Sequence, residues 1–278
     1  MTAHQLATQN VAHRSSRTLQ EVVDRDLLEA FRAWPLWTML GWNDIRQRYR
    51  RSVLGPFWIT LSMAIFIVLL GVIYSKLFHM DIATYLPYLT VGFILWGFIS
   101  TNTIESCTAF QANERIIRQI RLPYSIYVLH TVWRNFIVFL HTIVIFIPVA
   151  VIFSVKPGLV SLLAIPGLLL LYINQIWIGL VLAIVSTRYR DVLQLVTTAV
   201  QIAVFVTPIM WPVTMLKDAA YIAYLNPFFH LIDIVRAPML GTPPLLMSWV
   251  AAVAFAIIGW VVAILLLRRA ALRLVFWL

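Results

Sequence analysis

Cysteine and charged residues are both scarce in this sequence. Cys107 is the only cysteine, so the chain can form no internal disulfide and offers no thiolate cluster to a metal ion. Charged residues make up 12% of the chain against 62% hydrophobic residues, and the mean hydropathy of +0.88 lies outside the range of soluble proteins. We therefore expect nearly the whole chain to lie in a membrane, without a separate soluble domain.

Motifs that mark enzymes and nucleotide-binding proteins are missing as well. The sequence contains no H-E-x-x-H, no G-x-S-x-G and no carboxylate pair inside an apolar stretch, so we expect no catalytic residue and no metal site. None of the 10 glycines belongs to a G-x-x-x-x-G-K-[ST] phosphate loop. If ATP drives the function of this protein, another chain must bind the ATP.

Acidic residues are few, 11 in all, and they avoid the middle of the apolar stretches. Glu105 lies near one end of a stretch, and Asp81, Asp218 and Asp233 lie outside the stretches. Carriers driven by H⁺ or Na⁺ are expected to hold acidic residues deep in their spans. This pattern disfavours an ion-coupled carrier, and the sequence shows no internal repeat typical of such carriers.

Long apolar stretches dominate what is present. A helix needs roughly 20 consecutive apolar residues to cross a bilayer core, and six stretches meet this length. They are residues 57–78, 86–107, 134–155, 159–187, 192–213 and 245–267. The sequence therefore predicts an all-α integral membrane protein with six transmembrane helices, which together form a domain over residues 57–278.

Positive charge is distributed unevenly between the two sides of the predicted membrane. All but five of the 21 lysines and arginines lie on one side. The exceptions are Lys76, Lys156, Lys217 and Arg236 on the other side, and Arg134 at the entry to the third stretch. Because cytoplasmic loops carry an excess of Lys and Arg, both termini are predicted to be cytoplasmic. Basic residues in these places favour anionic lipid over nucleic acid.

The segment before the first stretch has two parts. Residues 1–20 are polar and lack the apolar core of a signal peptide, so we expect a disordered cytoplasmic tail. Residues 21–56 are predicted to form an amphipathic interface helix, bent at Pro35, followed by a basic elbow. Four arginines of the elbow are expected at the lipid head groups: Arg46, Arg48, Arg50 and Arg51.

The loop between the second and third stretches has the pattern of a short amphipathic helix. Asn113 can cap its start and Pro123 can end it. Isoleucines are expected on one face of this helix and arginines on the other. They are Ile116, Ile117 and Ile120, and Arg115, Arg118 and Arg121. Such a helix can dock on a cytosolic partner or lie on lipid, and the pattern alone does not choose between them.

Polar and aromatic side chains inside the stretches allow two interpretations. His130, His141 and Arg134 lie near the cytoplasmic end of the third stretch, where long side chains reach the head groups, so a structural role is favoured over a catalytic one. Asn174 and Gln175 can hydrogen-bond between helices or line a pore. Aromatic rings near the middle of the stretches can likewise pack between helices or line a pore along which sugar rings slide.

The loop between the fifth and sixth stretches contains a further apolar segment. Residues 225–240 include only about 11 apolar residues between turn signals, which is too short to cross the membrane and predicts a re-entrant or interfacial helix. Asn226 and Pro227 form a favourable helix start, and Pro238 a stop. Such a segment could cover the outer mouth of a pore.

Five segments in this order resemble the membrane subunits of ABC-2 type polysaccharide exporters, the group of O-antigen and teichoic-acid permeases. The segments are RQRYRRSVLGPFW (46–58), NERIIRQIRLP (113–123), RYRDV (188–192), TPIMWP (207–212) and LNPFFHLIDIVR (225–236). The resemblance extends over nearly the whole chain from about residue 21.

The resemblance implies a homodimer in the bacterial inner membrane with a pore between the two copies. Two copies of a separate subunit would bind ATP and Mg²⁺, and this chain would carry no cofactor. The substrate would be a lipid-linked polysaccharide, with its lipid head entering near the interface helix and its glycan following through the pore. ATP binding would pull on a helix of each copy and so move the spans that line the pore.

The resemblance also assigns roles to particular residues. The helix that inserts into the ATPase would contain Asn113, Glu114, Arg115, Ile116, Ile117, Arg118, Ile120 and Arg121, with a second contact at Arg188, Arg190 and Asp191. The anionic lipid head would meet Arg46, Arg48, Arg50 and Arg51. Phe57, Trp58, Phe66, Phe205 and Trp211 would line the channel, and Asn226, Pro227, Phe228 and Phe229 would form its outer gate.

Two other interpretations stay open at this point. An ABC-2 exporter of a small hydrophobic drug or a lipid would have the same architecture. A membrane-bound acyl- or glycosyltransferase could use His130 or His141, and replacing these histidines would then abolish its activity, whereas an exporter should tolerate the loss of the imidazoles.

Overall fold

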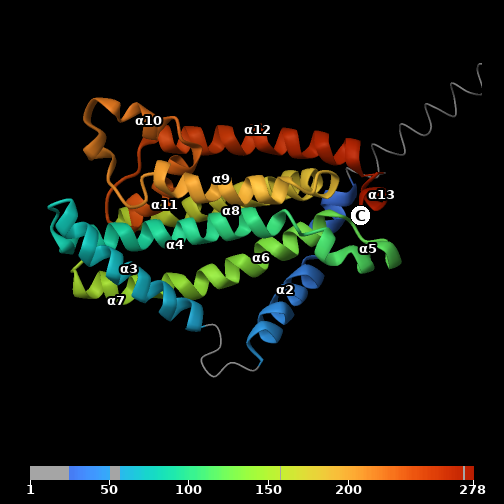
Figure 1. Ribbon diagram of the computed structural model, residues 1–278, viewed down its shortest axis with the longest axis horizontal. Helices are drawn as coiled ribbons and strands as arrows, with labels where there is room; N and C mark the ends of the chain where they lie inside the picture. Colours follow the sequence, from blue (N-terminus) through green and yellow to red (C-terminus); the bar gives the residue numbers. More distant parts are fainter. Residues whose placement is uncertain (1–24, 51–56, 157, 272) are drawn as a thin grey trace, which may run out of the picture.

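The computed structural model describes residues 25–50, 57–156, 158–271 and 273–278, within which helices occur but no β-strand. Five helical segments in this part of the chain are long and apolar enough to cross a membrane. They are α3 (Phe57–Leu77), α4 (Ile82–Ser106), α6 and α7 (Ser125–Thr142 and Phe146–Ile152), α8 (Ala164–Arg188, preceded by a turn from Leu159) and α12 (Leu246–Ala270). The prediction of an all-α membrane protein is confirmed (Figure 1).

The predicted fifth span is shorter than the others. α9 runs from Val192 to Val206, and at about 1.5 Å per residue its 15 residues extend about 22 Å, less than a hydrocarbon core of roughly 30 Å. The helix ends where Thr207 adopts a ψ of 136°, the extended conformation that a residue before proline prefers. The count of six membrane spans therefore stays a prediction.

The third span begins earlier than expected. α6 starts at Ser125 and not near residue 134, so His130 and Arg134 lie within the helix and not at its entry. The predicted start near residue 134 was wrong because the charge of Arg134 lowers the local hydropathy, so the apolar stretch was taken to begin there. In the structure Arg134 is tolerated inside the helix because two carboxylates lie against it.

The helical segment before the first span agrees with the prediction of a bent helix. Residues 25–32 are helical, the chain turns at Ala33, and α2 (Trp34–Tyr49) has Pro35 in its first turn, where proline is tolerated. α2 extends well past residue 42, so its second half carries Arg46 and Arg48. The predicted tail at 1–20 and the elbow residue Arg51 lie outside the described residues.

α4 and α8 form the middle of the bundle. α4 contacts α3, α6, α8, α9 and α11 (Pro227–Met239), and α8 contacts α6, α11 and α12. Most side chains of α4 are buried, whereas α3 buries only Ile67, Gly71 and Ser75, and every residue of α9 keeps part of its surface exposed. α3 and α9 are therefore the outer helices of this chain, with surface left for lipid or for another protein.

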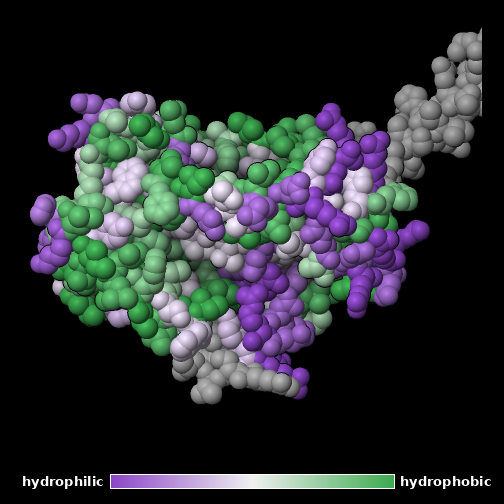
Figure 2. Space-filling model, viewed as in Figure 1, coloured by the Kyte–Doolittle hydropathy of each residue, from purple (hydrophilic) through white to green (hydrophobic). Residues whose placement is uncertain are grey.

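The two ends of the bundle differ in character. α5 (Glu114–Gln119), the start of α9 and the end of α12 lie at one end, which we call the basic end; α10 (Tyr221–Tyr224) and the start of α12 lie at the opposite end (Figure 1). Figure 2 shows hydrophilic residues gathered over α2 and α5 and hydrophobic residues over the spans.

Candidate functional site

The predicted docking helix forms at the basic end, but it is short. A 3₁₀ turn at Gln111–Asn113 leads into α5, which ends at Gln119. Ile120 is already extended, with φ −125° and ψ 128°, so the chain leaves the helix before the predicted stop at Pro123. The helix thus covers six residues of the predicted eleven-residue segment 113–123.

Asn113 does not cap α5 as predicted. Its Nδ2 donates to the carbonyl oxygen of Ala109 at 2.8 Å, and the Asn113 side chain makes no capping hydrogen bond to the first turn of α5. The reason is that residues 108–113 already turn, with the N–H of Ala112 bonded to Thr108 O and that of Asn113 bonded to Phe110 O. A cap residue lies outside the helical path, whereas Asn113 lies on it.

The three isoleucines of this segment do not share a face. Ile117 is buried in the core cluster that contains Phe110 and Ile126, whereas Ile116 and Ile120 are 41% and 54% exposed. Successive residues point about 100° apart on a helix, and positions i and i+4 point together. The outward surface is therefore apolar at Ile116 and Ile120 and bordered by exposed arginines: Arg115, Arg118 and Arg121.

The second predicted contact lies at the same end of the bundle. Arg188 ends α8, with its guanidinium 4.9 Å from the ring centroid of Trp277, and Arg190 and Asp191 are exposed. Gln111 Nε2 donates to the carbonyl oxygen of Ser186 at 3.1 Å, which ties the α5 loop to the end of α8. The structure therefore brings the two predicted docking segments to one surface.

Asp26 fixes the segment 25–32 to the start of α6, which the sequence pattern did not reveal. Its carboxylate accepts hydrogen bonds from the backbone N–H groups of Tyr124 (2.6 Å) and Ser125 (3.1 Å) and from the Ser125 hydroxyl (2.5 Å). Two N–H groups at the beginning of a helix are thereby satisfied. Burial raises the pKa of Asp26 above its ordinary value, although these hydrogen bonds act in the opposite direction.

A network of charged residues joins α2, α4 and α6 near the basic end. Arg134 on α6 donates to Asp44 of α2 at 2.8 Å and to Glu105 of α4 at 2.7 Å. Arg48 lies 3.7 Å from Glu105, and His130 Nε2 lies 2.9 Å from Asp44 Oδ2. Four charges of balanced sign therefore lock the surface helix onto two spans. Sequence reasoning missed Asp44 and placed Glu105 only by its position near a membrane end.

The predicted head-group arginines are not equivalent. Arg46, Arg48 and Arg50 are all exposed near the end of α2, but Arg48 lies 3.7 Å from Glu105 and belongs to the charge network. The arrangement leaves Arg46 and Arg50 available to an anionic head group. Arg51 lies outside the described residues.

The predicted channel residues lie on the outer helices. Phe57, Trp58 and Phe66 on α3 and Phe205 on α9 are all between 47% and 64% exposed. A groove of about 510 Å³ between α3 and α4 brings Trp58 and Phe66 together with further aromatic rings and with hydroxyl groups. These are Phe93, Trp96, Ser62, Ser100 and Thr101. Trp211 follows α9 and donates to Phe205 O at 3.1 Å. Their role as channel lining stays a prediction.

The amides in the spans hydrogen-bond between helices. Asn102 Nδ2 on α4 donates to the side chain of Gln175 on α8 at 3.1 Å, and Asn174 Nδ2 donates to Ala252 O of α12 at 3.3 Å. Of the two alternatives for Asn174 and Gln175, the helix-bridging one is confirmed. Both side chains are fully buried, as a bridging role requires.

The predicted gate segment forms a helix that packs inside the bundle. α11 starts at Pro227, with Asn226 Oδ1 accepting from the N–H of Phe228 at 2.9 Å, so the predicted cap is confirmed. The helix is packed among α4, α8 and α12, and it ends at Met239, one residue past Pro238. Phe229 is buried, and the ring of Phe228 lies 5.6 Å from that of Trp96. The helix is thus part of the core of the bundle, and its role as an outer gate stays a prediction.

Comparison with known protein families agrees with this architecture. The family profile described as "ABC-2 type transporter" matches residues 35–240, from the first turn of α2 to the end of α11. The chain belongs to the ABC-2 type transporter family. The match covers the charge network, both docking segments and α11, so these features lie in the part of the chain that the family shares.

Three curated relatives of this ABC-2 protein carry the same descriptive name. Two from Klebsiella pneumoniae, each named O-antigen export system permease protein RfbA, are 25% and 24% identical over 195 residues, 68% of this chain and 74% of theirs. A third, with the same name, from Myxococcus xanthus, is 19% identical over 199 residues, 70% of this chain and 76% of its own. Family membership favours transport over a transferase that uses His130 or His141.

Proposed function

We propose that this ABC-2 protein is the membrane subunit of an exporter that carries a lipid-linked, O-antigen-like polysaccharide across the bacterial inner membrane. The similarity to three O-antigen export permeases over more than two thirds of the chain is the observation that carries this proposal. Two copies of the chain form the pore, and two copies of a separate subunit bind and hydrolyse ATP. Both termini lie in the cytoplasm, on the side of the basic end.

The surface of α5 supports the ATPase partner. Ile116 and Ile120 present exposed apolar side chains between exposed arginines, a pattern that fits a shallow apolar cleft with acidic edges. Because Ile117 is buried, a pull on the outward surface of α5 acts on the core of the chain. The exposed turn Arg188–Asp191 supplies a second, smaller contact.

The groove between α3 and α4 supports a glycan as the substrate. Its aromatic rings offer flat apolar area to sugar C–H faces, and its three hydroxyl groups exchange hydrogen bonds with sugar hydroxyls. Neither group fixes a single sugar tightly, which suits a chain that must slide. Arg46 and Arg50 would hold the anionic lipid head at the entrance.

A pull-down tests the partner. Tagged protein would be purified from its native host in mild detergent and assayed for ATP hydrolysis, for wild type and for Ile116→Asp/Ile120→Asp. We expect an ATPase with the wild type and its loss with the double variant. Leu225→Asp is the matched control, because Leu225 is 78% exposed outside the spans, between α10 and α11 at the opposite end, and it should retain the ATPase.

The outcomes separate the parts of the proposal. A wild-type protein that brings no ATPase would refute ATP-driven export by this chain. An ATPase that survives the double substitution would refute α5 as the docking helix. For the substrate, transport of a labelled, glycan-loaded lipid into inverted vesicles would be measured, and unlabelled glycolipid should inhibit it. Transport that only hydrophobic dyes inhibit would indicate a drug or lipid exporter.

A further inference from the structure

The segment that follows α9 is irregular, yet it is firmly held. Pro208 O accepts a hydrogen bond from Arg236 Nη1 at 2.7 Å, and Met210 O accepts one from the Tyr85 hydroxyl at 2.6 Å. Tyr88 Oη lies 3.0 Å from Pro208 O and 3.2 Å from Trp211 O. Non-helical backbone at membrane depth is tolerated only where such partners satisfy its carbonyl groups.

The groups that hold this segment come from the core of the bundle. Tyr85 and Tyr88 belong to α4, and Arg236, only 4% exposed, belongs to α11. The Arg236 guanidinium also lies 4.0 Å from the centroid of the Tyr88 ring, a cation–π contact that keeps it in place. We call Tyr85, Tyr88 and Arg236 the carbonyl clamp.

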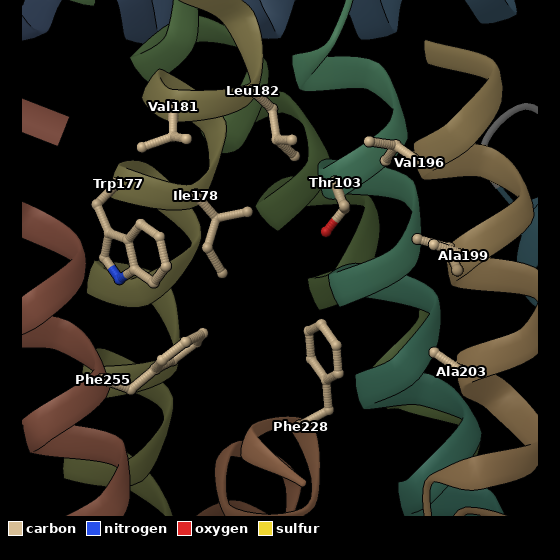
Figure 3. Close-up of a pocket in the computed structure, with 11 residues that line it drawn as sticks. Thr103, Trp177, Ile178, Val181, Leu182, Val196, Ala199, Ala203, Phe228 and Phe255 are labelled. Atoms are coloured by element: carbon tan, nitrogen blue, oxygen red, sulfur yellow. The ribbon is translucent and has the colours of Figure 1, made fainter. Parts of the chain in front are cut away.

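α9 itself is packed loosely beyond this segment. An apolar cavity of about 290 Å³ separates it from α8, α11 and α12. Figure 3 shows Val196, Ala199 and Ala203 of α9 on one side of the cavity, with Trp177 and Ile178 of α8 and Phe255 of α12 on the other. This cavity is open at the surface of the chain, so lipid tails can enter it. Along the cavity α9 packs mainly against α4 and has little contact with α8, which leaves it room to move in that direction.

Among the described residues, the opposite end of α9 carries no clamp of this kind, and we call it the free end. It is joined to the end of α8 by a short turn, in which the N–H of Val192 donates to Tyr189 O at 3.2 Å. It begins after the turn Tyr189–Asp191, whose residues are all exposed at the basic end. α9 therefore has a fixed end at residues 207–211, an open space along its middle, and a free end at the surface proposed to meet the ATPase. A tilt of about 10° would move the free end of a helix about 22 Å long by roughly 4 Å.

We propose that α9 is a lever that pivots on residues 207–211. Tyr85, Tyr88 and Arg236 are positioning residues that hold the pivot. The cavity receives α9 when the helix tilts. Force applied at the turn Tyr189–Asp191 tips the free end of α9 towards α8. The face of α9 that carries Phe205 then moves away from the second copy of the chain, and the space between the two copies widens. This inference rests on the proposed ATP-driven transport.

Cross-linking across the cavity tests the pivot. In a Cys107→Ser background, one variant carries Leu182→Cys and Val196→Cys near the free end, and a second carries Phe228→Cys and Ala203→Cys near the pivot. The intact complex with its ATPase would be treated with a short bifunctional maleimide, with and without Mg-ATP. Thiols left unlinked would be counted by a gel shift with maleimide-polyethylene glycol.

A pivot produces a gradient along α9. We expect Mg-ATP to raise the cross-linking rate several-fold at the 182/196 pair and little at the 203/228 pair. Equal changes at both pairs would indicate that α9 slides as a whole and would overturn the pivot. Unchanged cross-linking rates in a complex that hydrolyses ATP would overturn the movement of α9 but leave the proposed function standing. Absence of ATPase from the purified protein would instead refute the proposed function.

Filling the cavity tests whether the movement matters. Ala203→Leu places a larger apolar side chain in the cavity, and transport should fall several-fold while ATP hydrolysis continues. Ala64→Leu is the matched control, because Ala64 lines another apolar cavity, between α3 and the α6–α7 region, that α9 does not border. Normal transport by a folded Ala203→Leu protein would overturn the inference.

The clamp has its own readout. Arg236→Gln removes the charge and the cation–π contact, and Tyr88→Phe removes only the hydroxyl and keeps the ring. With the pivot loosened, the ATP-dependent rate at the 182/196 pair should fall and that at the 203/228 pair should rise. A purely structural role would lower stability without reversing this gradient, so thermal unfolding of each variant would be measured alongside.

Discussion

Arg134 joins two carboxylates from different helices, and its replacement by methionine would test the charge network directly. Methionine keeps a flexible side chain but leaves Asp44 and Glu105 without their shared partner. Breaking a buried ion pair costs about 3–5 kcal/mol, because an uncompensated charge stays behind. Asp44 and Glu105 are 38% and 28% exposed, so water reduces this cost. We expect the free energy of unfolding to fall by about 2 kcal/mol.

The free energy of unfolding would be measured by SDS titration of the purified protein in mild detergent, followed by tryptophan fluorescence. Arg46→Met, an exposed arginine on α2, is the matched control and should change stability by less than about 0.5 kcal/mol. Adding Glu105→Gln to Arg134→Met removes one stranded charge, so the double variant should be more stable than the sum of the single effects. Additive effects, or an Arg134→Met protein as stable as wild type, would refute the network.

Three further predictions concern single residues. Because burial raises the pKa of Asp26 above 3.8, the folded chain binds a proton at Asp26 more tightly than the unfolded chain does. Relative to Asp26→Asn, the wild type should therefore gain stability as the pH falls towards 3.8 and lose this stability as the pH rises through the raised pKa. Thermal unfolding at a series of pH values would measure the difference. Gly167→Leu should cost roughly 1–3 kcal/mol in unfolding titrations, because a Cβ there would lie 2.4 Å from Ile234 O, whereas Gly158→Leu meets nothing within 4 Å and should be neutral. Arg118→Ala breaks an exposed i,i+4 ion pair and should change stability by less than about 0.5 kcal/mol in the same assay.

The sequence predicted the membrane architecture because length and hydropathy are properties of each span alone. It also located the loop of α5 and the start of α11, since a polar residue before a proline or an apolar run is a local signal. The face of α5 was predicted wrongly because all three isoleucines look alike in a helical pattern. Only the tertiary fold, which places Ile117 in the same core cluster as Phe110 and Ile126, decides that Ile117 turns inward.

Features that depend on distant residues could not be predicted in the same way. Asp26 meets Ser125, and Asp44 meets Arg134, across nearly a hundred positions of the chain, and no local pattern relates them. Arg236 was placed by the charge count on the far side of the membrane, and this gave no hint that its guanidinium holds a proline carbonyl. A buried arginine inside an apolar segment was the one available signal.

The placement of α11 has a consequence for the biosynthesis of the protein. This helix is enclosed partly by α12, which the ribosome makes later, and its polar residues find their partners there: Asp233 accepts from the Ser248 hydroxyl at 2.7 Å, and His230 Nδ1 lies 3.0 Å from the same oxygen. Until α12 has been inserted, both polar side chains would face lipid or water without Ser248. In a nascent chain that stops before Leu246, α11 would therefore lack its partners on α12, and the chain should be a substrate for membrane quality-control proteases. The next 25 residues form α12 and supply these partners.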